Sequence, residues 1–323
     1  MTDTSTKTGP TRFGFLLINH FTLISMSSAV EPLRMANRIC RDEVYAWKLI
    51  SETGAAVRAS GGLSINVDNG IIDGDVLSNV DAVIVCGGWN VEQNTSEPVL
   101  RWLRTIGQSG VAFGSTCTGS YLLASAGLLD GYRCSVHWEN MAALTDLFPN
   151  IHVSRSVYTI DRDRYTCSGG TAPVDMMLHF IKVQCGNEVS TGVAEQFIHE
   201  RIRRSGEHQR VPLKHVVGKQ SEKLVIAVEL MEANIKEPMS QADIASYTGI
   251  SRRQLQRLFE RYLMCGPSRY YQQIRLSRAR ELLRQTSKHL VEISALTGFV
   301  SSSHFSKSYK EFFGHSPSAE RRQ

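Results

Sequence analysis

Near its C-terminal end the chain reads Ile244-Ala-Ser-Tyr-Thr-Gly-Ile-Ser-Arg-Arg-Gln-Leu-Gln-Arg-Leu-Phe259, and Ile293-Ser-Ala-Leu-Thr-Gly-Phe-Val-Ser-Ser-Ser-His-Phe-Ser-Lys-Ser-Tyr309 follows about fifty residues later. Both stretches place an apolar residue, Thr-Gly, an aliphatic or aromatic residue and a second apolar-striped segment in the same order. Three pairs of residues share an offset of fifty: Leu255 with Phe305, Phe259 with Tyr309, and Pro267 with Pro317. This internal repeat predicts an all-α domain with two helix-turn-helix units.

Capping residues mark the helices of the first unit. Ser240 precedes a helix predicted over Gln241–Tyr247, and Ser251 caps the next one. Apolar residues at helical spacing should face the core: Leu255, Leu258, Phe259 and Tyr262. The other face carries side chains that bond bidentately to guanine and adenine edges: Arg252, Arg253, Gln256 and Arg257. Such a face is typical of a recognition helix in the major groove of DNA.

The second unit repeats this pattern with fewer charges. Its apolar face consists of Phe305, Tyr309, Phe312 and Phe313. Its exposed face carries Ser302, Ser303, His304 and Lys307, so we expect it to touch mostly phosphates or to read fewer bases. A helix predicted over Pro267–Arg284 joins the two units and carries Arg269, Arg275, Arg278, Arg280 and Arg284. These arginines either touch phosphates or form a solvated helix face.

The charge of the chain is unevenly distributed. The 323 residues carry a net charge of +5. Residues 223–323 hold 16 Lys and Arg against 9 Asp and Glu, a net of +7, whereas the rest holds 20 against 22, a net of −2. A basic C-terminal end indicates a polyanionic partner. The alternative to a DNA-binding domain is a helical bundle that has no role with nucleic acids.

Cysteine usage and the N-terminus indicate a reduced, cytoplasmic protein. The seven cysteines are scattered and form no Cys-x-x-Cys motif, so we expect neither a disulfide framework nor a metal site, and no cofactor. Residues 1–11 are polar and predict a disordered tail rather than a signal peptide. No stretch is long and apolar enough to indicate a membrane span.

Residues 12–185 alternate strand-like and helix-like segments. Strands are predicted at Phe13–Asn19, Val44–Ser51, Val80–Cys86, Val111–Phe113 and Arg133–Val136. Helices are predicted at Ser27–Cys40, Ser96–Gln108, Ser120–Ala126 and Pro173–Gln184. This alternation predicts an α/β, flavodoxin-like domain whose mostly parallel sheet is covered by helices on both faces. Ligands of such sheets bind beyond the carboxyl ends of the strands.

Three turns should lie at those ends: Cys86-Gly-Gly-Trp89, Gly114-Ser-Thr-Cys-Thr-Gly119 and Cys167-Ser-Gly-Gly-Thr171. The middle one has the strand, tight turn and helix of a nucleophile elbow around Cys117. The following helix N-terminus would favour a thiolate or a bound carboxylate. His137 lies twenty residues on and could approach Cys117. The alternative interpretation is that Cys117 is a small buried apolar residue and that His137 is a polar residue whose hydrogen bonds are made within the protein.

Residues 12–185 resemble the DJ-1/PfpI branch of the class I glutamine amidotransferase-like superfamily. The resemblance rests on Gly114–Gly119, on Leu122-Leu-Ala-Ser-Ala-Gly-Leu-Leu-Asp-Gly131 and on Val136-His-Trp138. It implies that Cys117 and His137 stand at the family's nucleophile and histidine positions. The family's Glu lies four residues before a Pro, but here Ser28 stands four residues before Pro32 and the nearest acid is Glu31. We therefore expect a vestigial catalytic pair in a binding pocket, and not an enzyme.

Residues 223–323 are similar to the AraC/XylS family of transcription regulators. Beside the tandem repeat, the similarity rests on Gly298-Phe299, Phe305, Lys307-Ser-Tyr-Lys310 and the terminal Gly314-His-Ser-Pro-Ser318. The pairing of the two domains resembles regulators of amine and amino-acid catabolism that respond to glycine betaine, dimethylglycine, carnitine, sarcosine or arginine. The resemblance implies a homodimeric transcription activator that binds promoter DNA and RNA polymerase in the cytoplasm, at the nucleoid.

A quaternary ammonium ligand needs aromatic faces, and three aromatic residues follow predicted strands: Phe21, Trp89 and Trp138. A ligand carboxylate could be held by the amides after Cys117 or by Thr118. Two other functions remain open, namely an enzyme that uses Cys117 as nucleophile and His137 as base, and a ligand-independent repressor. Residues 186–222 are predicted as a helix over Glu188–Ile202 followed by a linker, with Ser205–Gln209 as a hinge that either reports ligand state or is a passive tether.

Overall fold

The computed structural model describes residues 9–73, 80–209, 222–286 and 288–321. The chain forms two compact units, Met1–Gln209 and Arg210–Gln323. The predicted disordered tail lies mostly outside the described residues, but β1 already begins at Thr11. Residues 186–209, predicted as helix and linker, pack with the first unit.

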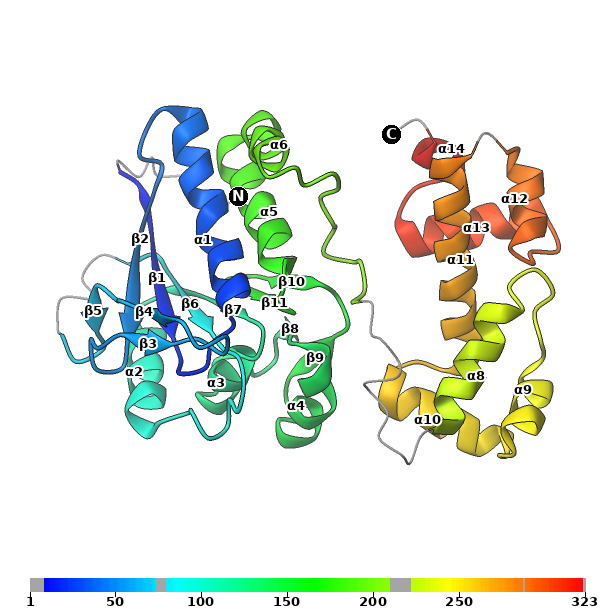
Figure 1. Ribbon diagram of the computed structural model, residues 1–323, viewed down its shortest axis with the longest axis horizontal. Helices are drawn as coiled ribbons and strands as arrows, with labels where there is room; N and C mark the ends of the chain where they lie inside the picture. The colour runs from blue at the N-terminus through cyan, green and yellow to red at the C-terminus, as the bar shows by residue number, and fades with distance from the viewer. Residues whose placement is uncertain (1–8, 74–79, 210–221, 287, 322–323) are drawn as a thin grey trace. The chain divides into compact units, whose positions relative to one another are not determined.

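The first unit alternates strands and helices in the predicted manner (Figure 1). Its strands are β1 (Thr11–Leu17), β2 (Tyr45–Ser51), β3 (Val57–Arg58), β4 (Ser64–Ile65), β5 (Asn69–Gly70), β6 (Ala82–Cys86), β7 (Ala112–Thr116), β8 (Arg133–Ser135), β9 (His152–Ser154), β10 (Tyr158–Asp161) and β11 (Arg164–Cys167). Its helices are α1 (Leu23–Cys40), α2 (Glu97–Gly107), α3 (Ser120–Ser125), α4 (Met141–Leu147), α5 (Ala172–Cys185) and α6 (Asn187–Gln196).

The main sheet has seven strands in the order β10-β11-β7-β6-β1-β2-β5. All neighbouring strands are parallel except β10 and β11. One buried cluster packs α1, α5 and α6 against one face, and a second packs α2, α3 and α4 against the other (Figure 1). The predicted α/β fold with helices on both faces is therefore confirmed. The predicted strand at Arg133–Val136 pairs instead with β9 in a separate small sheet.

Two helix boundaries differ from the sequence prediction. Helix α1 begins at Leu23 rather than Ser27, and the hydroxyl of its N-cap Thr22 bonds to Cys117 instead of capping the helix. Helix α6 ends at Gln196 rather than Ile202. Ile198 adopts a left-handed backbone with φ of 53°, and the residues that follow bond to α5 instead of continuing the helix.

The second unit is all helical, as predicted (Figure 1). Its helices are α8 (Glu222–Ala233), α9 (Gln241–Thr248), α10 (Arg252–Leu263), α11 (Pro267–Gln285), α12 (Leu290–Leu296), α13 (Ser302–Phe313) and α14 (Pro317–Glu320). Each helix-turn-helix has its own small core. Helix α11 supplies Tyr271 to the first core and Leu276, Ala279 and Leu283 to the second, so it joins the two.

Candidate functional site

Four turns meet beyond the carboxyl ends of adjacent strands in the first unit. Cys117 follows β7, Gly87 and Gly88 follow β6, Thr22 follows β1, and Gly169 follows β11. Thr22 donates its backbone N–H to the Gly87 carbonyl at 3.0 Å, and the Thr118 hydroxyl donates to the Gly88 carbonyl at 2.8 Å. The three glycine-bearing turns singled out in the sequence therefore lie at one site.

Cys117 sits on a strained turn between β7 and α3. Its φ is 58°, in the left-handed region that costs non-glycine residues free energy. Gly169 packs directly on it, since a Cβ at Gly169 would lie 2.8 Å from the Cys117 Cβ. The elbow geometry predicted from the sequence is thus present, with a side chain that is only 7% exposed.

The Cys117 thiol is held in its neutral form. Burial raises its pKa, and hydrogen bonds from the Thr22 hydroxyl, at 3.5 Å, and from the Thr118 amide offset burial only in part. Because thiolate and not thiol is the nucleophile, this environment disfavours covalent chemistry. The Thr118 amide and hydroxyl are both engaged, so neither is free for the ligand carboxylate that the sequence suggested.

His137 lies beside Cys117, but its ring turns elsewhere. The two residues meet through the backbone, where the His137 N–H donates to the Cys117 carbonyl at 3.2 Å. The His137 ring is tilted by 36° to that of Trp138, with 5.3 Å between centroids, and its Nδ1 lies 3.6 Å from a Glu139 carboxylate oxygen. Burial lowers the pKa of His137, although Glu139 acts in the opposite direction. The thiol receives its side-chain hydrogen bond from Thr22 instead.

Glu31, the acid nearest to the family's Glu position, bonds elsewhere. Glu31 forms an ion pair with Arg34 at 2.7 Å, on a part of α1 where both side chains are 46% exposed. The carboxylate that acts on the Cys117 thiol is that of Glu139, which raises the thiol pKa. Thr22 and Glu139 are the site residues that the sequence analysis missed. The sequence offered one indication of Glu139, because it lies two residues after His137, which stands at the family's histidine position.

The aromatic candidates have different surroundings. Trp138 is half-buried beside His137 in a short 3-10 turn. Trp89 is 71% exposed, and its backbone N–H donates to the His20 carbonyl. Phe21 is fully buried in the core and has no surface left for a ligand. Trp138 is therefore the aromatic residue best placed at the site.

Neither a metal cluster nor a membrane span is found in the described parts of the chain. Within residues 9–73, 80–209, 222–286 and 288–321, no group of three or more His, Cys, Asp or Glu side chains could hold a metal ion. Among the helices of those same ranges, none is long and apolar enough to cross a membrane.

The first candidate reading helix is α10. Ser251 caps it in a reciprocal capping box with Gln254, so its first turn is firmly defined. Arg252, Arg253 and Arg257 are exposed, as expected. Gln256 differs, because it is half-buried against Gly266 and donates to Glu260 at 2.6 Å.

The second candidate reading helix is α13, which Ser301 caps by accepting from the His304 amide. Ser303, His304 and Lys307 are exposed and Ser302 is half-buried. His304 also packs edge-on to Phe299, with 5.7 Å between ring centroids. Both helices therefore present polar first turns to solvent, with Arg on α10 and hydroxyl, imidazole and Lys side chains on α13.

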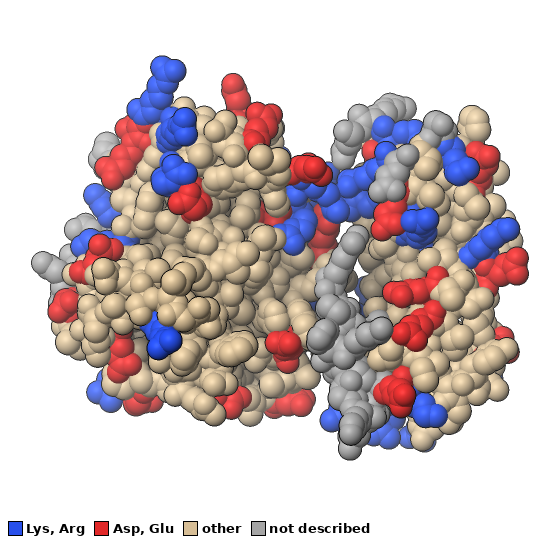
Figure 2. All heavy atoms as spheres, in the orientation of Figure 1, with Lys and Arg blue, Asp and Glu red and all other residues tan. Residues whose placement is uncertain are grey.

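Three of the five arginines of α11 bond to other parts of the second unit, and the other two lie on its surface. Arg275 donates to the carbonyls of Thr297 and Gly298. Arg280 and Arg284 both bond to the buried carboxylate of Glu320. Arg278 pairs with Glu281 on the surface, and Arg269 is exposed. Most of these charges thus stabilise the unit itself. On the visible face of each unit, both signs of charge are interspersed (Figure 2).

Comparison with known proteins identifies both units. Residues 15–183 match the DJ-1/PfpI family, and residues 244–323 match a helix-turn-helix domain. The chain is 51% identical over 312 residues to the HTH-type transcriptional regulator GbdR of Pseudomonas aeruginosa, covering 97% of this chain and 84% of that protein. It is 39% identical to the HTH-type transcriptional regulator CdhR of the same species, covering 96% and 91%.

A solved structure agrees with these matches. The AraC family transcriptional regulator from Pseudomonas putida superimposes with a TM-score of 0.54 at 29% identity, over 58% of this chain and 100% of that one. The chain is therefore a transcriptional regulator, not an enzyme, that belongs to the DJ-1/PfpI family and carries an AraC-type helix-turn-helix DNA-binding domain.

Proposed function

We propose that the first unit binds a small amine, betaine or amino acid, and that this ligand switches the second unit to activate transcription. The observation that carries the proposal is the Cys117 site. It keeps the turns of the family pocket, yet its thiol is neutral and Glu31 lies away in an ion pair with Arg34. Such a site is suited to binding and not to turnover.

The surroundings of His137 support a cationic ligand. Trp138 offers an aromatic face, and the half-exposed carboxylate of Glu139 lies next to it in sequence and near the imidazole. An ammonium group is attracted both by an aromatic face and by an opposite charge. We therefore assign the cation of the ligand to Trp138 and Glu139, with Cys117, Thr118 and His137 forming the adjacent wall.

The second unit reads promoter DNA with two helices. We assign base contacts to Arg252, Arg253 and Arg257 of α10, and phosphate or limited base contacts to Ser302, Ser303, His304 and Lys307 of α13. Gln256 could contact a base only after its side-chain hydrogen bond to Glu260 is broken. Activation implies contact with RNA polymerase at the nucleoid, within the cytoplasm. A homodimer would place two copies on repeated sites.

Ligand titration tests this proposal. The full chain is heated with glycine betaine, dimethylglycine, carnitine, sarcosine or L-arginine, because a ligand that binds only the folded state raises the melting temperature. We expect at least one compound to raise it, and Trp138→Ala and Glu139→Gln to abolish the increase. Glu97→Gln, an exposed carboxylate on α2, is the matched control. Unchanged melting across the panel would instead favour a ligand-independent repressor.

A further inference from the structure

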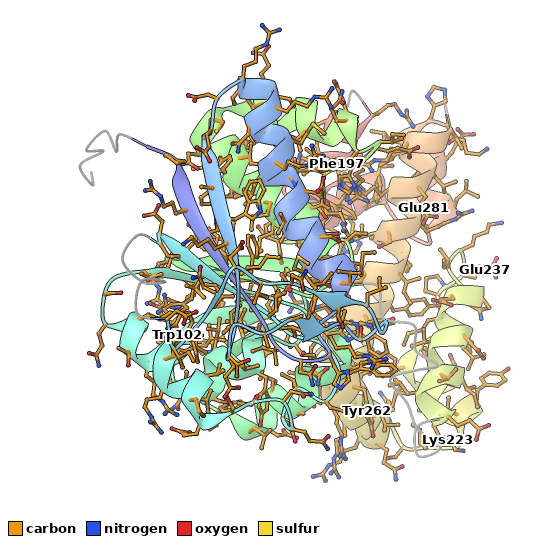
Figure 3. The ribbon with its side chains drawn as sticks, turned by 60° about the vertical axis from the view of Figure 1, so that its left-hand side comes forward. Trp102, Phe197, Lys223, Glu237, Tyr262 and Glu281 are labelled. Carbon is orange, nitrogen blue, oxygen red and sulfur yellow. The ribbon has the colours of Figure 1, made fainter. Side chains whose placement is uncertain are left out.

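Each helix-turn-helix has a basic side chain that binds the carbonyl end of its turn. In the second unit, Arg275 of α11 donates through Nε to the Thr297 carbonyl at 2.7 Å and through Nη2 to the Gly298 carbonyl at 2.5 Å. In the first helix-turn-helix of the same unit, Lys223 of α8, which is labelled in Figure 3, donates to the Thr248 carbonyl at 2.7 Å. The helix that precedes each helix-turn-helix thus holds its Thr-Gly turn at the equivalent place.

The Arg275 contact differs from that of Lys223 because it lies where the two helix-turn-helix units meet. A Cβ at Gly298 would be 2.6 Å from the Ile235 carbonyl oxygen and 2.7 Å from Pro238 Cγ, so the second turn packs on the connection between α8 and α9. The Arg275 guanidinium also lies 4.2 Å from the centre of the Phe299 ring, and this contact adds a cation–π attraction.

One turn earlier, α11 also holds the first helix-turn-helix. The Tyr271 hydroxyl donates to the Asn234 carbonyl at 2.7 Å and accepts from the Met239 amide at 3.3 Å. Residues 271 and 275 are four apart and lie on one face of α11. On that face, Tyr271 therefore bonds to the α8–α9 connection and Arg275 bonds to the α12–α13 turn.

We infer that Arg275 is a positioning residue that sets the spacing and orientation of α13 relative to α10, and so the distance between the two DNA elements that the protein reads. The inference rests on the proposed assignment of α10 and α13 as reading helices. Without the guanidinium, two carbonyls of the turn lose their donor, and the second helix-turn-helix can pivot on α11 about Gly298.

Selection from a randomised duplex library tests this inference on the full chain. The wild type should enrich two short elements at one fixed spacing. Arg275→Gln should enrich the same elements at several spacings or singly, and Arg275→Lys, which keeps one donor, should lie between. Arg278→Gln is the control, because Arg278 is on the same helix but pairs only on the surface with Glu281.

Two results would overturn the inference. The first is a spacing distribution for Arg275→Gln and Arg275→Lys that matches the wild type. The second is the loss of one element from both variants with the remaining spacing intact, which would make Arg275 a DNA contact. If the wild type enriched no sequence at all, the assignment of the reading helices would fail, and this inference with it.

A second set of contacts, in the first unit, connects the candidate ligand site to the start of the inter-unit segment. Gln209, the last residue of the first unit, is 8% exposed and donates from Nε2 to the Val136 carbonyl at 2.9 Å. Val136 immediately precedes His137, whose amide bonds to Cys117. The backbone N–H of Gln209 also donates to the Arg155 carbonyl at 2.8 Å. Gln209 is therefore bonded to the first unit through both its backbone and its side chain, unlike the hinge that the sequence predicted.

The segment that follows α6, residues 197–209, is also bonded to the first unit near its beginning. The fully buried Asp175 of α5 accepts from the Arg203 amide at 2.6 Å and from its Nε at 2.8 Å, and it pairs with His199 at 2.9 Å. A buried carboxylate that is paired and hydrogen-bonded in this way is costly to release. The segment 197–209 is therefore fixed on the first unit up to the residue that touches Val136.

We propose that a ligand at the Cys117–His137 site acts on the DNA-binding unit through the Val136–Gln209 hydrogen bond. This coupling rests on the proposed ligand response. Displacement of His137 would move the Val136 carbonyl and so shift the start of the inter-unit segment. Lys223, the second residue of α8, bonds to the turn of the first helix-turn-helix.

Paired binding measurements on the full chain, with glycine betaine as the probe, test this coupling. Gln209→Ala should bind the probe within twofold of the wild type, yet lose at least fivefold of the probe-dependent change in DNA affinity. Gln196→Ala, an exposed glutamine at the end of α6, should behave as the wild type. A wild-type response in Gln209→Ala would overturn the coupling. Absence of a response in the wild type would overturn the ligand proposal on which the coupling rests.

Discussion

Cys117 combines the backbone geometry of a nucleophile elbow with a buried thiol whose pKa is raised. Its left-handed backbone is enforced by β7, α3 and the close approach of Gly169. Its protonation state is set separately, by burial against the weaker effects of Thr22 and Thr118. The geometry of the turn and the protonation of its thiol are therefore set by different parts of the structure.

Alkylation measures this protonation state. Because the pKa of the buried thiol is raised, we expect iodoacetamide to label Cys117 much more slowly at pH 7 than the half-exposed Cys265, with labelling that rises only above the ordinary thiol pKa of about 8.5. Thr22→Ala removes a hydrogen bond that lowers the pKa and should slow labelling further. Peptide mapping by mass spectrometry reads both sites. Rapid labelling of Cys117 at pH 7 would restore the case for a nucleophile.

Among the exposed arginines of α10, Arg253 gives the sharpest test of base reading. Arg253→Ala should reduce discrimination between the best site and a one-base variant by about 1–3 kcal/mol, because a bidentate contact is lost. Arg261→Ala, on the last turn of the same helix beside Tyr262, removes the same charge away from the reading turn. It should weaken binding to all sequences alike. Equal effects of both changes in competition assays would show that the reading face is wrongly assigned.

At the scale of elements, the short helix α14 closes the second helix-turn-helix through Glu320. The carboxylate of this buried residue accepts from Arg280 at 3.0 Å, from Arg284 at 2.7 Å and from the Tyr309 hydroxyl at 3.0 Å. Burial by itself would raise the pKa of Glu320, but hydrogen bonds from Arg280 and His315 outweigh it and hold the pKa at about 2. Four residues of helix thereby join α11 to α13.

This lowered pKa predicts how acid affects stability. A carboxyl group whose folded pKa lies below its unfolded value of 4.5 contributes stability above that value and loses it as the pH falls toward about 2. We expect Glu320→Gln to cost about 3 kcal/mol at pH 7 and to flatten the loss of stability between pH 4.5 and 2. Urea unfolding followed at several pH values measures this. A steep acid dependence that survives in the variant would contradict the assignment.

Local signals predicted most elements, and the failures have a common cause. Ser96, Ser240 and Ser251 cap the helices that follow them, as the sequence indicated, because a cap acts within three residues. Helix α6 was predicted too long, since its end depends on Asp175, more than twenty residues away in the sequence. Thr22 stands at the N-cap of α1, but the bond from its hydroxyl to Cys117, 95 residues away, could not be predicted locally.

At the scale of the whole molecule, the two units have separate buried cores. Two clusters lie on the faces of the sheet in the first unit, and two others lie around α11 in the second. Units with separate cores can unfold separately, so one melting temperature would not describe this chain.

We therefore expect two calorimetric transitions in the full chain. A ligand that binds only the first unit should raise one of them, and cognate DNA should raise the other, because each stabilises the folded form that it binds. A single transition raised equally by both would show that the units unfold together. Trp138→Ala serves as the control, since it should remove the effect of the small ligand and leave that of DNA.

The sequence by itself determined the alternation of the main strands and helices, the mostly parallel sheet, the two helix-turn-helix motifs and the exposed arginines of α10, whereas the short strands β3–β5 and β9–β11 and the helix α4 were not predicted. These features follow from periodicity, capping and an internal repeat, all of which act over a few residues or are visible as a pattern. Only the tertiary structure decided that Thr22 and Glu139 act on Cys117, that Arg275 holds the second turn and that Gln209 bonds to Val136, the residue before His137. Such contacts join residues twenty or more positions apart, and no local preference encodes them.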